Sequence, residues 1–177
     1  MTSIKIRYPY SKPFIDKNDI KAVNQVLKNA YLTQGKKLID FESKLKKTFK
    51  SKYAIACNSG TAALHMIYMS LGANESKGVL TTPLTFLATA NAAKMCNAPV
   101  YFADVDEKTG LMDLNSAEEQ LKKNKKISFI SLVHLGGRLG NLEEYSTLAK
   151  KYNCLIIEDA CHAPGSSYVS QSGNNYL

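Results

Sequence analysis

Five short apolar segments alternate with helical patterns from residue 53 onward, and this alternation constrains the fold more than any other feature of the sequence. Helical patterns fill the intervals at 60–71, about 85–95, about 115–124 and 142–152. The apolar segments are YAIAC (53–57), GVLTT (78–82), PVYFADV (99–105), ISFISLV (127–133) and CLIIE (154–158). Because strands that alternate with helices form βαβ units, we predict an α/β domain of three layers with a mostly parallel sheet.

Two amphipathic patterns precede this alternation. The first is predicted to be a helix that begins after Asp16, a residue able to cap its exposed amides, and ends near Asn29. The second follows a break at Thr33-Gln34-Gly35 and has an apolar stripe of Leu38, Phe41, Leu45 and Phe49. We therefore expect residues 1–50 to form an N-terminal helical arm and residues 51–177 to form the domain that contains the sheet.

The composition is that of a folded protein, with 177 residues of which 45% are hydrophobic and 21% charged. No apolar stretch approaches the ~18 residues that a transmembrane helix needs, so we expect no membrane association. The first residues, MTSIKIRYPYSKPF, contain no apolar run after their basic residues and do not resemble a secretory signal. We therefore expect a cytoplasmic protein.

The net charge is +8, and it comes almost entirely from lysine, because only Arg7 and Arg138 are arginine. Nucleic-acid-binding proteins concentrate basic residues on one face, with aromatic residues between them. Here the lysines form two runs within or after amphipathic helices, at positions 44, 46, 47, 50 and 52 and at positions 122, 123, 125 and 126. These runs favour solvated helix faces, so we expect no nucleic-acid partner.

The four cysteines form no CxxC pair. Cys57 and Cys154 lie in or at the end of apolar runs, so both are expected to be buried thiols. Cys161 and His162 are adjacent, but two neighbouring residues cannot build a tetrahedral metal site. We therefore expect no metal ion and a reducing compartment.

Ligands of parallel sheets bind beyond the carboxyl ends of the strands, so the residues after each apolar segment are the candidate site. Asn58-Ser59-Gly60-Thr61 follows the first segment and opens a helix. The free amides of a helix N-terminus, a glycine that permits close approach and two hydroxyl groups suit a phosphate. The alternative is an ordinary turn in which Ser59 caps the helix.

Three further residues lie at the same predicted edge. Asp159 ends the most hydrophobic segment and could pair with the protonated nitrogen of a pyridine cofactor; the alternatives are a magnesium ligand and a helix cap. Phe86 could lie flat on a cofactor ring or belong to the core. His162 could bond a ring hydroxyl or be structural.

The segments YSKPFIDKNDIKAVNQVLKNAYLTQGKKLIDFE, CNSGTAALHM, TTPLTFLATANAAKMCNAPVYFADVD and IIEDACHAPGS together resemble the sugar aminotransferases of the DegT/StrS family. The resemblance implies a pyridoxal-phosphate enzyme with the aspartate aminotransferase fold (fold type I), of which this chain would be part of the large domain. By this resemblance, the cofactor phosphate is bound by Ser59, Gly60 and Thr61, and its ring is stacked by Phe86. Asp159 pairs with the ring nitrogen, and His162 lies near the ring hydroxyl.

The resemblance also implies the reaction and its partners. An amino donor, glutamate, gives its amino group to the cofactor, which passes it to the C4 ketone of a nucleotide-linked deoxysugar. Enzymes of this kind are homodimers when full length, and they serve amino-sugar and surface-polysaccharide biosynthesis.

The sequence departs from the family pattern at the catalytic lysine. In the family, a lysine some tens of residues beyond the aspartate of EDA forms the Schiff base and moves protons. Here SSYVSQSGNNYL contains no lysine, so no catalytic residue is assigned. We expect an N-terminal fragment that lacks the C-terminal half and is inactive alone. Two alternatives remain, a related sugar dehydratase that uses histidine and a non-enzymatic phosphate- or nucleotide-binding α/β module.

Overall fold

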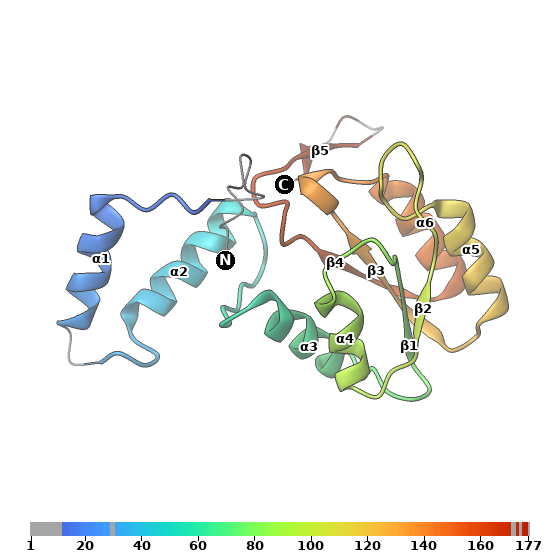
Figure 1. Cartoon of the computed structure of the whole chain (residues 1–177), viewed down its shortest axis with the longest axis horizontal. Helices are drawn as coiled ribbons and strands as arrows, with labels where there is room; N and C mark the ends of the chain where they lie inside the picture. The colour runs from blue at the N-terminus through green and yellow to red at the C-terminus, as the bar shows by residue number, and fades with distance from the viewer. Residues whose placement is uncertain (1–11, 29–30, 171–172, 174, 177) are drawn as a thin grey trace, which may run out of the picture. The chain divides into compact units, whose positions relative to one another are not determined.

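The computed structural model describes residues 12–28, 31–170, 173 and 175–176, and the chain divides into two compact units (Figure 1). The units are Met1–Ala54 and Ile55–Leu177. No helix in the described part of the chain combines the length and the apolar content that a bilayer crossing requires.

The first unit contains two helices, α1 (Lys17–Leu27) and α2 (Lys36–Thr48). Asp16 caps α1, because its Oδ1 accepts hydrogen bonds from the backbone N–H groups of Asn18 at 2.7 Å and Asp19 at 3.0 Å. The predicted end of this helix near Asn29 lies outside the described residues. Neither helix contains a fully buried residue, and in their apolar stripes Val26, Leu45 and Phe49 are half-buried.

The second unit is built on a parallel sheet of four strands in the order β2-β1-β3-β4 (Figure 1). The strands are β1 (Gly78–Thr81), β2 (Val100–Phe102), β3 (Ile127–Val133) and β4 (Leu155–Asp159). Four of the five predicted strands therefore form, and the predicted α/β class with a parallel sheet is confirmed. A small antiparallel pair follows, which the sequence did not predict, of β5 (Tyr168–Val169) and β6 (Asn175–Tyr176).

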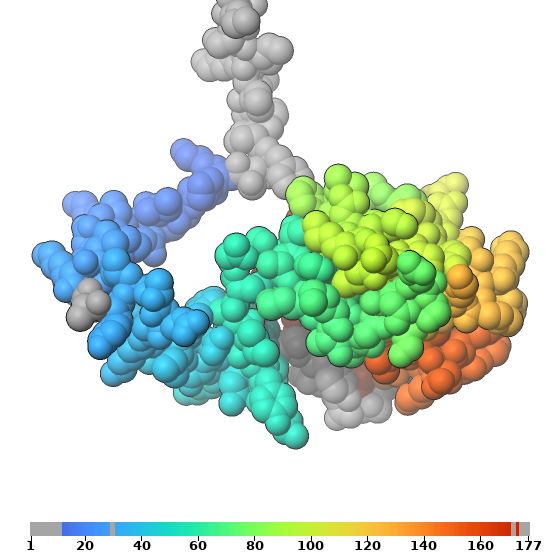
Figure 2. Space-filling view, turned by 90° about the horizontal axis from the view of Figure 1, so that it is seen from below, coloured from blue at the N-terminus to red at the C-terminus, as the bar shows by residue number. Residues whose placement is uncertain are grey.

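Helices cover both faces of the sheet. Side chains of α3 (Gly60–Ser70) and α4 (Ala88–Met95) share one buried cluster with Val79, Phe129 and Ile157. Side chains of α5 (Leu114–Lys123) and α6 (Leu142–Tyr152) share a second cluster with Leu80, Ile130 and Leu132. Neighbouring residues of a strand thus belong to opposite clusters, which is the alternation that a sheet covered on both faces requires. Figure 2 shows the outer surface of α3 and α4 in green.

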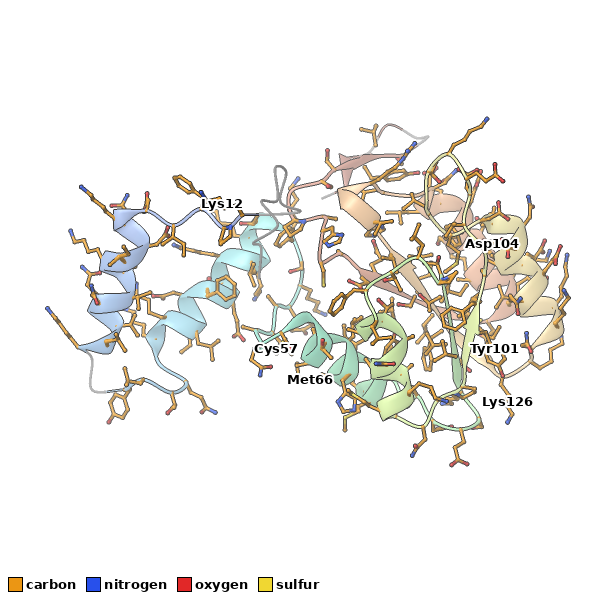
Figure 3. All side chains as sticks on the ribbon, in the orientation of Figure 1. Lys12, Cys57, Met66, Tyr101, Asp104 and Lys126 are labelled. Atoms are coloured by element: carbon orange, nitrogen blue, oxygen red, sulfur yellow. The ribbon has the colours of Figure 1, made fainter. Side chains whose placement is uncertain are left out.

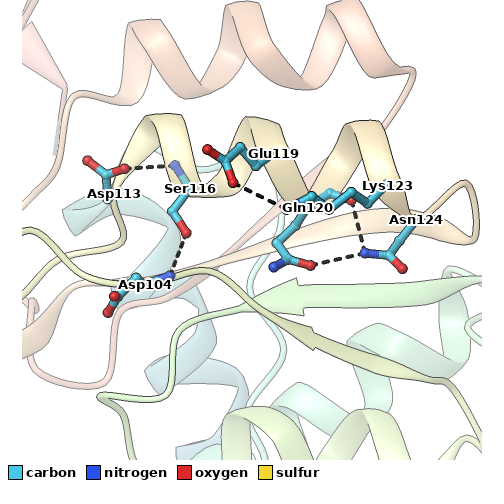
Figure 4. Close-up of polar contacts among 7 residues, drawn as sticks. All are labelled: Asp104, Asp113, Ser116, Glu119, Gln120, Lys123 and Asn124. Atoms are coloured by element: carbon cyan, nitrogen blue, oxygen red, sulfur yellow. Dashed lines mark hydrogen bonds and ion pairs between the residues drawn. The ribbon is translucent and has the colours of Figure 1, made fainter.

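A capping network fixes the start of α5 against the end of β2 (Figure 4). Asp113 Oδ1 accepts a hydrogen bond from the Ser116 backbone N–H at 2.7 Å, and Ser116 Oγ accepts one from the Asp104 backbone N–H at 2.8 Å. Along the same helix, Lys123 donates to Glu119 at 3.3 Å. The loop that follows β2 is therefore held against α5 by hydrogen bonds.

The predicted strand at 53–57 is wrong, because this segment has no regular secondary structure and takes no place in the sheet. Tyr53 is 71% exposed and Ile55 is 78% exposed. Cys57, labelled in Figure 3 just before α3, is exposed, which corrects its expected burial, whereas Cys154 is buried as expected. An apolar run predicts burial only where a neighbouring strand pairs with it, and a local pattern carries no information on that partner.

Candidate functional site

The strand order places the candidate site at the carboxyl ends of β1 and β3. From β1 the chain moves outward to β2, and it then crosses to the other side of β1 to form β3 and β4. Such a change of direction leaves a crevice between the connections, where ligands of open α/β sheets bind. The loop Thr82–Phe86 follows β1, and the 3-10 turn η1 (Leu135–Gly137) follows β3.

Asp159 is the last residue of β4 and pairs in register with Val133. It is 8% exposed, and its carboxylate accepts two hydrogen bonds. Thr89 Oγ1 donates to Oδ2 at 2.7 Å, and the Cys161 backbone N–H donates to Oδ1 at 3.4 Å. Because each carboxylate oxygen can accept more than one hydrogen bond, Asp159 keeps capacity for a further donor.

The turn Asn58–Thr61 leads into α3, whose first residue is Gly60. Ser59 Oγ accepts a hydrogen bond from the Ala62 backbone N–H at 3.1 Å, so the capping role that was the alternative for Ser59 is present. The hydroxyl proton of Ser59 is not used by this bond and stays available to a ligand. Ser59 and Gly60 are exposed, and Thr61 is half-buried.

Gly60 connects this turn to the neighbourhood of Asp159. A Cβ built on Gly60 would lie 2.8 Å from Cys161 Sγ, closer than real Cβ atoms approach other atoms. Cys161 is two residues beyond Asp159, and its backbone N–H bonds that carboxylate. The N-terminus of α3 and the carboxylate of Asp159 therefore lie at the same edge of the sheet.

Phe86 precedes α4 and is 75% exposed, which excludes its alternative role as a core residue. Its carbonyl accepts a hydrogen bond from the Thr89 backbone N–H at 3.1 Å. Thr89 in turn bonds Asp159 through its side chain. One helical turn thus holds the exposed aromatic residue close to the carboxylate.

His162 is exposed and lies against the turn after β3. The Gly136 backbone N–H donates to His162 Nδ1 at 3.3 Å, so the neutral ring carries its proton on Nε2 and can donate there. Gly137 has a φ of +80°, and a Cβ on it would lie 2.8 Å from the His162 carbonyl oxygen. This close contact brings η1 and His162 together.

Sequence reasoning missed the buried polar groups behind Asp159. The Tyr68 hydroxyl lies 3.0 Å from Ser131 Oγ and 3.2 Å from the Thr89 carbonyl oxygen. Thr85 Oγ1 lies 2.8 Å from Thr89 Oγ1. The one signal for this network was the spacing of Thr85 and Thr89, four residues apart at the start of a helix that follows a strand.

Two titratable groups near Asp159 have raised pKa values. Burial, and to a lesser extent the charge of Asp159, raise the pKa of Tyr68 to about 12. Desolvation, followed by the hydrogen bond and charge of Asp159, raises the pKa of the Cys161 thiol to about 11. Both side chains are therefore protonated and neutral at pH 7.

His134 directly follows β3 and lies at the predicted edge, but the sequence suggested no role for it. It is 2% exposed, and its Nε2 lies 2.8 Å from Glu158 Oε2. Its backbone N–H donates to the Asp159 carbonyl oxygen at 3.1 Å, which extends the pairing of β3 with β4 up to the site.

The comparisons with known proteins agree on one family. The model of the DegT/DnrJ/EryC1/StrS aminotransferase family matches residues 13–174. The chain is 48% identical over 160 residues to UDP-4-amino-4,6-dideoxy-N-acetyl-beta-L-altrosamine transaminase of Campylobacter jejuni, a match that covers 90% of this chain and 42% of that protein. The chain thus spans less than half the length of this relative.

Two solved structures share the fold. Helicobacter pylori PseC, described as an aminotransferase involved in the biosynthesis of pseudoaminic acid, superposes with a TM-score of 0.84 at 32% identity over 93% of this chain and 44% of its own. The sugar aminotransferase Spr1654 of Streptococcus pneumoniae, solved in its PLP form, has a TM-score of 0.86 at 24% identity over 93% of this chain and 45% of its own.

Proposed function

The chain belongs to the DegT/DnrJ/EryC1/StrS aminotransferase family, and we propose that it supplies the pyridoxal 5'-phosphate cradle of a nucleotide-sugar aminotransferase. The observation that carries the proposal is the contact of Gly60 with Cys161, two residues beyond Asp159. A helix N-terminus and a carboxylate at one sheet edge match the two ends of this cofactor, which are a phosphate and a ring nitrogen. The exposed Phe86 lies near them.

The start of α3 holds the phosphate in this proposal. The backbone N–H groups of the first turn point out of the helix, and its dipole favours an anion. Gly60 lets the phosphate approach the backbone, and Ser59 and Thr61 add hydroxyl donors. Since Ser59 Oγ accepts the capping bond from Ala62, its proton points elsewhere and can serve the ligand.

Three side chains hold the ring. Phe86 would stack on its face, Asp159 would accept a hydrogen bond from its protonated nitrogen, and His162 would donate from Nε2 to its hydroxyl. When bound, the protonated ring would withdraw electrons from the carbon that gives up its proton during the amino transfer. Asp159 keeps the proton on the ring nitrogen because an adjacent carboxylate favours the charged form of its partner.

The proposed substrate is a UDP-linked 4-keto-6-deoxy sugar, with glutamate as the amino donor. This assignment rests on the Campylobacter jejuni relative, whose name specifies an altrosamine derivative aminated at C4, and on Helicobacter pylori PseC. The whole enzyme is proposed to act as a cytoplasmic homodimer in the biosynthesis of pseudaminic acid or a similar amino sugar.

We further propose that this chain alone binds the cofactor but does not transaminate. The last lysine of the sequence is Lys151, in α6, and no lysine follows Asp159. A transfer of the amino group requires a base that moves the proton between substrate and cofactor carbons. The test is incubation with pyridoxal phosphate, glutamate and the 4-keto sugar nucleotide. We expect no catalytic formation of 2-oxoglutarate, and turnover would refute this part.

Cofactor binding is tested with pyridoxamine 5'-phosphate, which has the ring and the phosphate but no aldehyde to react with surface lysines. Calorimetric titration of the wild-type chain should show binding at one site, and Asp159→Asn should weaken it by roughly tenfold, since a charge-assisted hydrogen bond is lost. Asp104→Asn, which alters an exposed carboxylate after β2, is the control and should bind normally. A non-enzymatic phosphate-binding module would bind equally with and without the Asp159 carboxylate.

A further inference from the structure

We propose that Thr89 is a positioning residue, whose hydroxyl orients the Asp159 carboxylate toward the ring nitrogen of the cofactor. The inference rests on the proposed function. Thr89 is fully buried in the first turn of α4, and its Oγ1 lies 2.7 Å from Asp159 Oδ2. The length is that of a charge-assisted O–H···O bond.

The hydroxyl has one proton and three oxygen atoms within reach, Asp159 Oδ2 at 2.7 Å, Thr85 Oγ1 at 2.8 Å and the Phe86 carbonyl oxygen at 3.2 Å. The shortest distance and the negative charge favour the carboxylate. Thr85 Oγ1, 2.8 Å from Thr89 Oγ1, then acts as the donor to Thr89. The two hydroxyl groups form a directed chain that ends on Asp159, and such chains polarise each bond in them.

The backbone of Thr89 is itself held in place. Its N–H donates to the Phe86 carbonyl at 3.1 Å, and its carbonyl lies 3.2 Å from the Tyr68 hydroxyl, which α3 contributes. Ser131 of β3 fixes that hydroxyl from the sheet side at 3.0 Å. Thr89 therefore bonds both the backbone of Phe86 and the carboxylate of Asp159.

Among the described residues, Tyr68 and Cys161 are two titratable side chains whose pKa values the charge of Asp159 affects, and both are neutral at pH 7. Burial holds the pKa of Tyr68 at about 12, and desolvation with the neighbouring carboxylate holds that of Cys161 at about 11. The shortest hydrogen bond that the carboxylate accepts is the one from Thr89. Removal of this hydroxyl therefore takes away the short hydrogen bond to Oδ2, while the longer bond from the Cys161 backbone N–H to Oδ1 remains.

The test compares Thr89→Val, which removes the hydroxyl at nearly constant volume, with Thr89→Ser, which keeps it. Pyridoxamine 5'-phosphate should bind Thr89→Val roughly tenfold more weakly than wild type and Thr89→Ser nearly as well as wild type. Thr81→Val is the matched control, because Thr81 is also fully buried and donates to the Ser131 carbonyl at 3.1 Å. It should bind normally.

A second ligand separates positioning from general damage. The 1-deaza analogue of pyridoxamine 5'-phosphate has carbon in place of the ring nitrogen, so it makes no bond to Asp159. It should bind wild type and Thr89→Val equally. Equal weakening of both ligands by Thr89→Val, or no weakening of either, would overturn the proposal. If wild type itself binds neither ligand, the proposed cofactor function has failed instead, and this inference fails with it.

A ligand-free measurement covers the case in which Thr89→Val is poorly folded. Thr85→Val removes only the donor to Thr89, at a half-buried position. The 13C resonance of the Asp159 carboxyl carbon at pH 7 should move in Thr85→Val and stay in place in Thr81→Val. An identical chemical shift of this carbon in Thr85→Val and in wild type would contradict the directed hydroxyl chain.

Discussion

Gly60 and Cys161 are packed so closely that a methyl group on Gly60 would stand 2.8 Å from the sulfur of Cys161. The two residues come from opposite ends of the sheet-containing unit in sequence, one at the start of α3 and one just after β4. Their contact keeps the α3 N-terminus close to the segment that follows Asp159.

Gly60→Ala should therefore weaken binding of pyridoxamine 5'-phosphate by roughly tenfold, since an added carbon in a tight contact costs about 1–3 kcal/mol. Thermal stability should fall as well, because the tight contact with Cys161 exists without the ligand and the helix preference of alanine offsets only about 1 kcal/mol of its cost. The double variant Gly60→Ala/Cys161→Ala removes the sulfur and should recover most of the affinity. A double variant that binds as weakly as Gly60→Ala would show that the sulfur is not the obstacle.

Phe86→Ala should lose affinity for the same ligand without losing stability. The ring is 75% exposed, so its removal uncovers little apolar surface, whereas stacking on the cofactor contributes about 0.5–1.5 kcal/mol. Calorimetry and a thermal melt measure the two effects. Leu87→Ala, an equally exposed neighbour at 68%, is the control and should change neither quantity.

Tyr68→Phe should destabilise the fold by about 1–3 kcal/mol, because Ser131 and the Thr89 carbonyl lose a buried partner. Tyr145→Phe provides a matched control on the other face of the sheet, where the hydroxyl donates to the Met112 carbonyl at 2.7 Å. Urea unfolding should give similar losses for both. Ligand affinity should fall only in Tyr68→Phe. Equal affinity in the two variants would show that Tyr68 does not influence ligand binding at the site.

Glu118 should make stability depend on pH in the acid range. Hydrogen bonds from Lys151 first, then from Lys122 and Tyr152, lower the pKa of this carboxyl to about 2. A group whose pKa is lowered on folding stabilises the protein above its unfolded pKa, near 4.5, and this stabilisation disappears as the pH falls toward 2.

Glu118→Gln should accordingly melt at a lower temperature than wild type at pH 7, and the difference should vanish near pH 2. Glu119→Gln is the control, because Glu119 pairs only with Lys123 among the described residues and both are exposed. Its melting temperature should follow wild type at every pH. A difference for Glu118→Gln that persists at pH 2 would contradict the assigned ion pairs.

The sequence predicted those parts of the fold that depend on local pattern. The four strands that form combine apolar runs with helices on both sides, and the helices begin near residues that can cap them, such as Asp16 and Ser59. The segment at 53–57 has the same apolar character, yet Ile55 is exposed. Whether this segment forms a strand depends on a neighbouring strand that pairs with it, and the local sequence does not show whether such a strand exists.

The sequence predicted the residues that would contact a ligand, but not the buried residues that hydrogen-bond to them. Asp159, Phe86 and Gly60 could be found because each follows a predicted strand. Thr89 and Tyr68 could not, because threonine in a helix and tyrosine in an apolar stripe are ordinary residues until the fold brings them beside Asp159. The roles of the six predicted site residues in binding remain predictions, which the variants above test.

The raised pKa of Cys161 has a chemical consequence for an aldehyde cofactor. A thiolate beside such a ligand would be a competing nucleophile, but desolvation and the adjacent Asp159 hold the thiol pKa at about 11. Desolvation, supported by the carboxylate that would bind the ring nitrogen, thus keeps the neighbouring sulfur protonated and unreactive at neutral pH. A cysteine can therefore occupy this position without trapping the aldehyde.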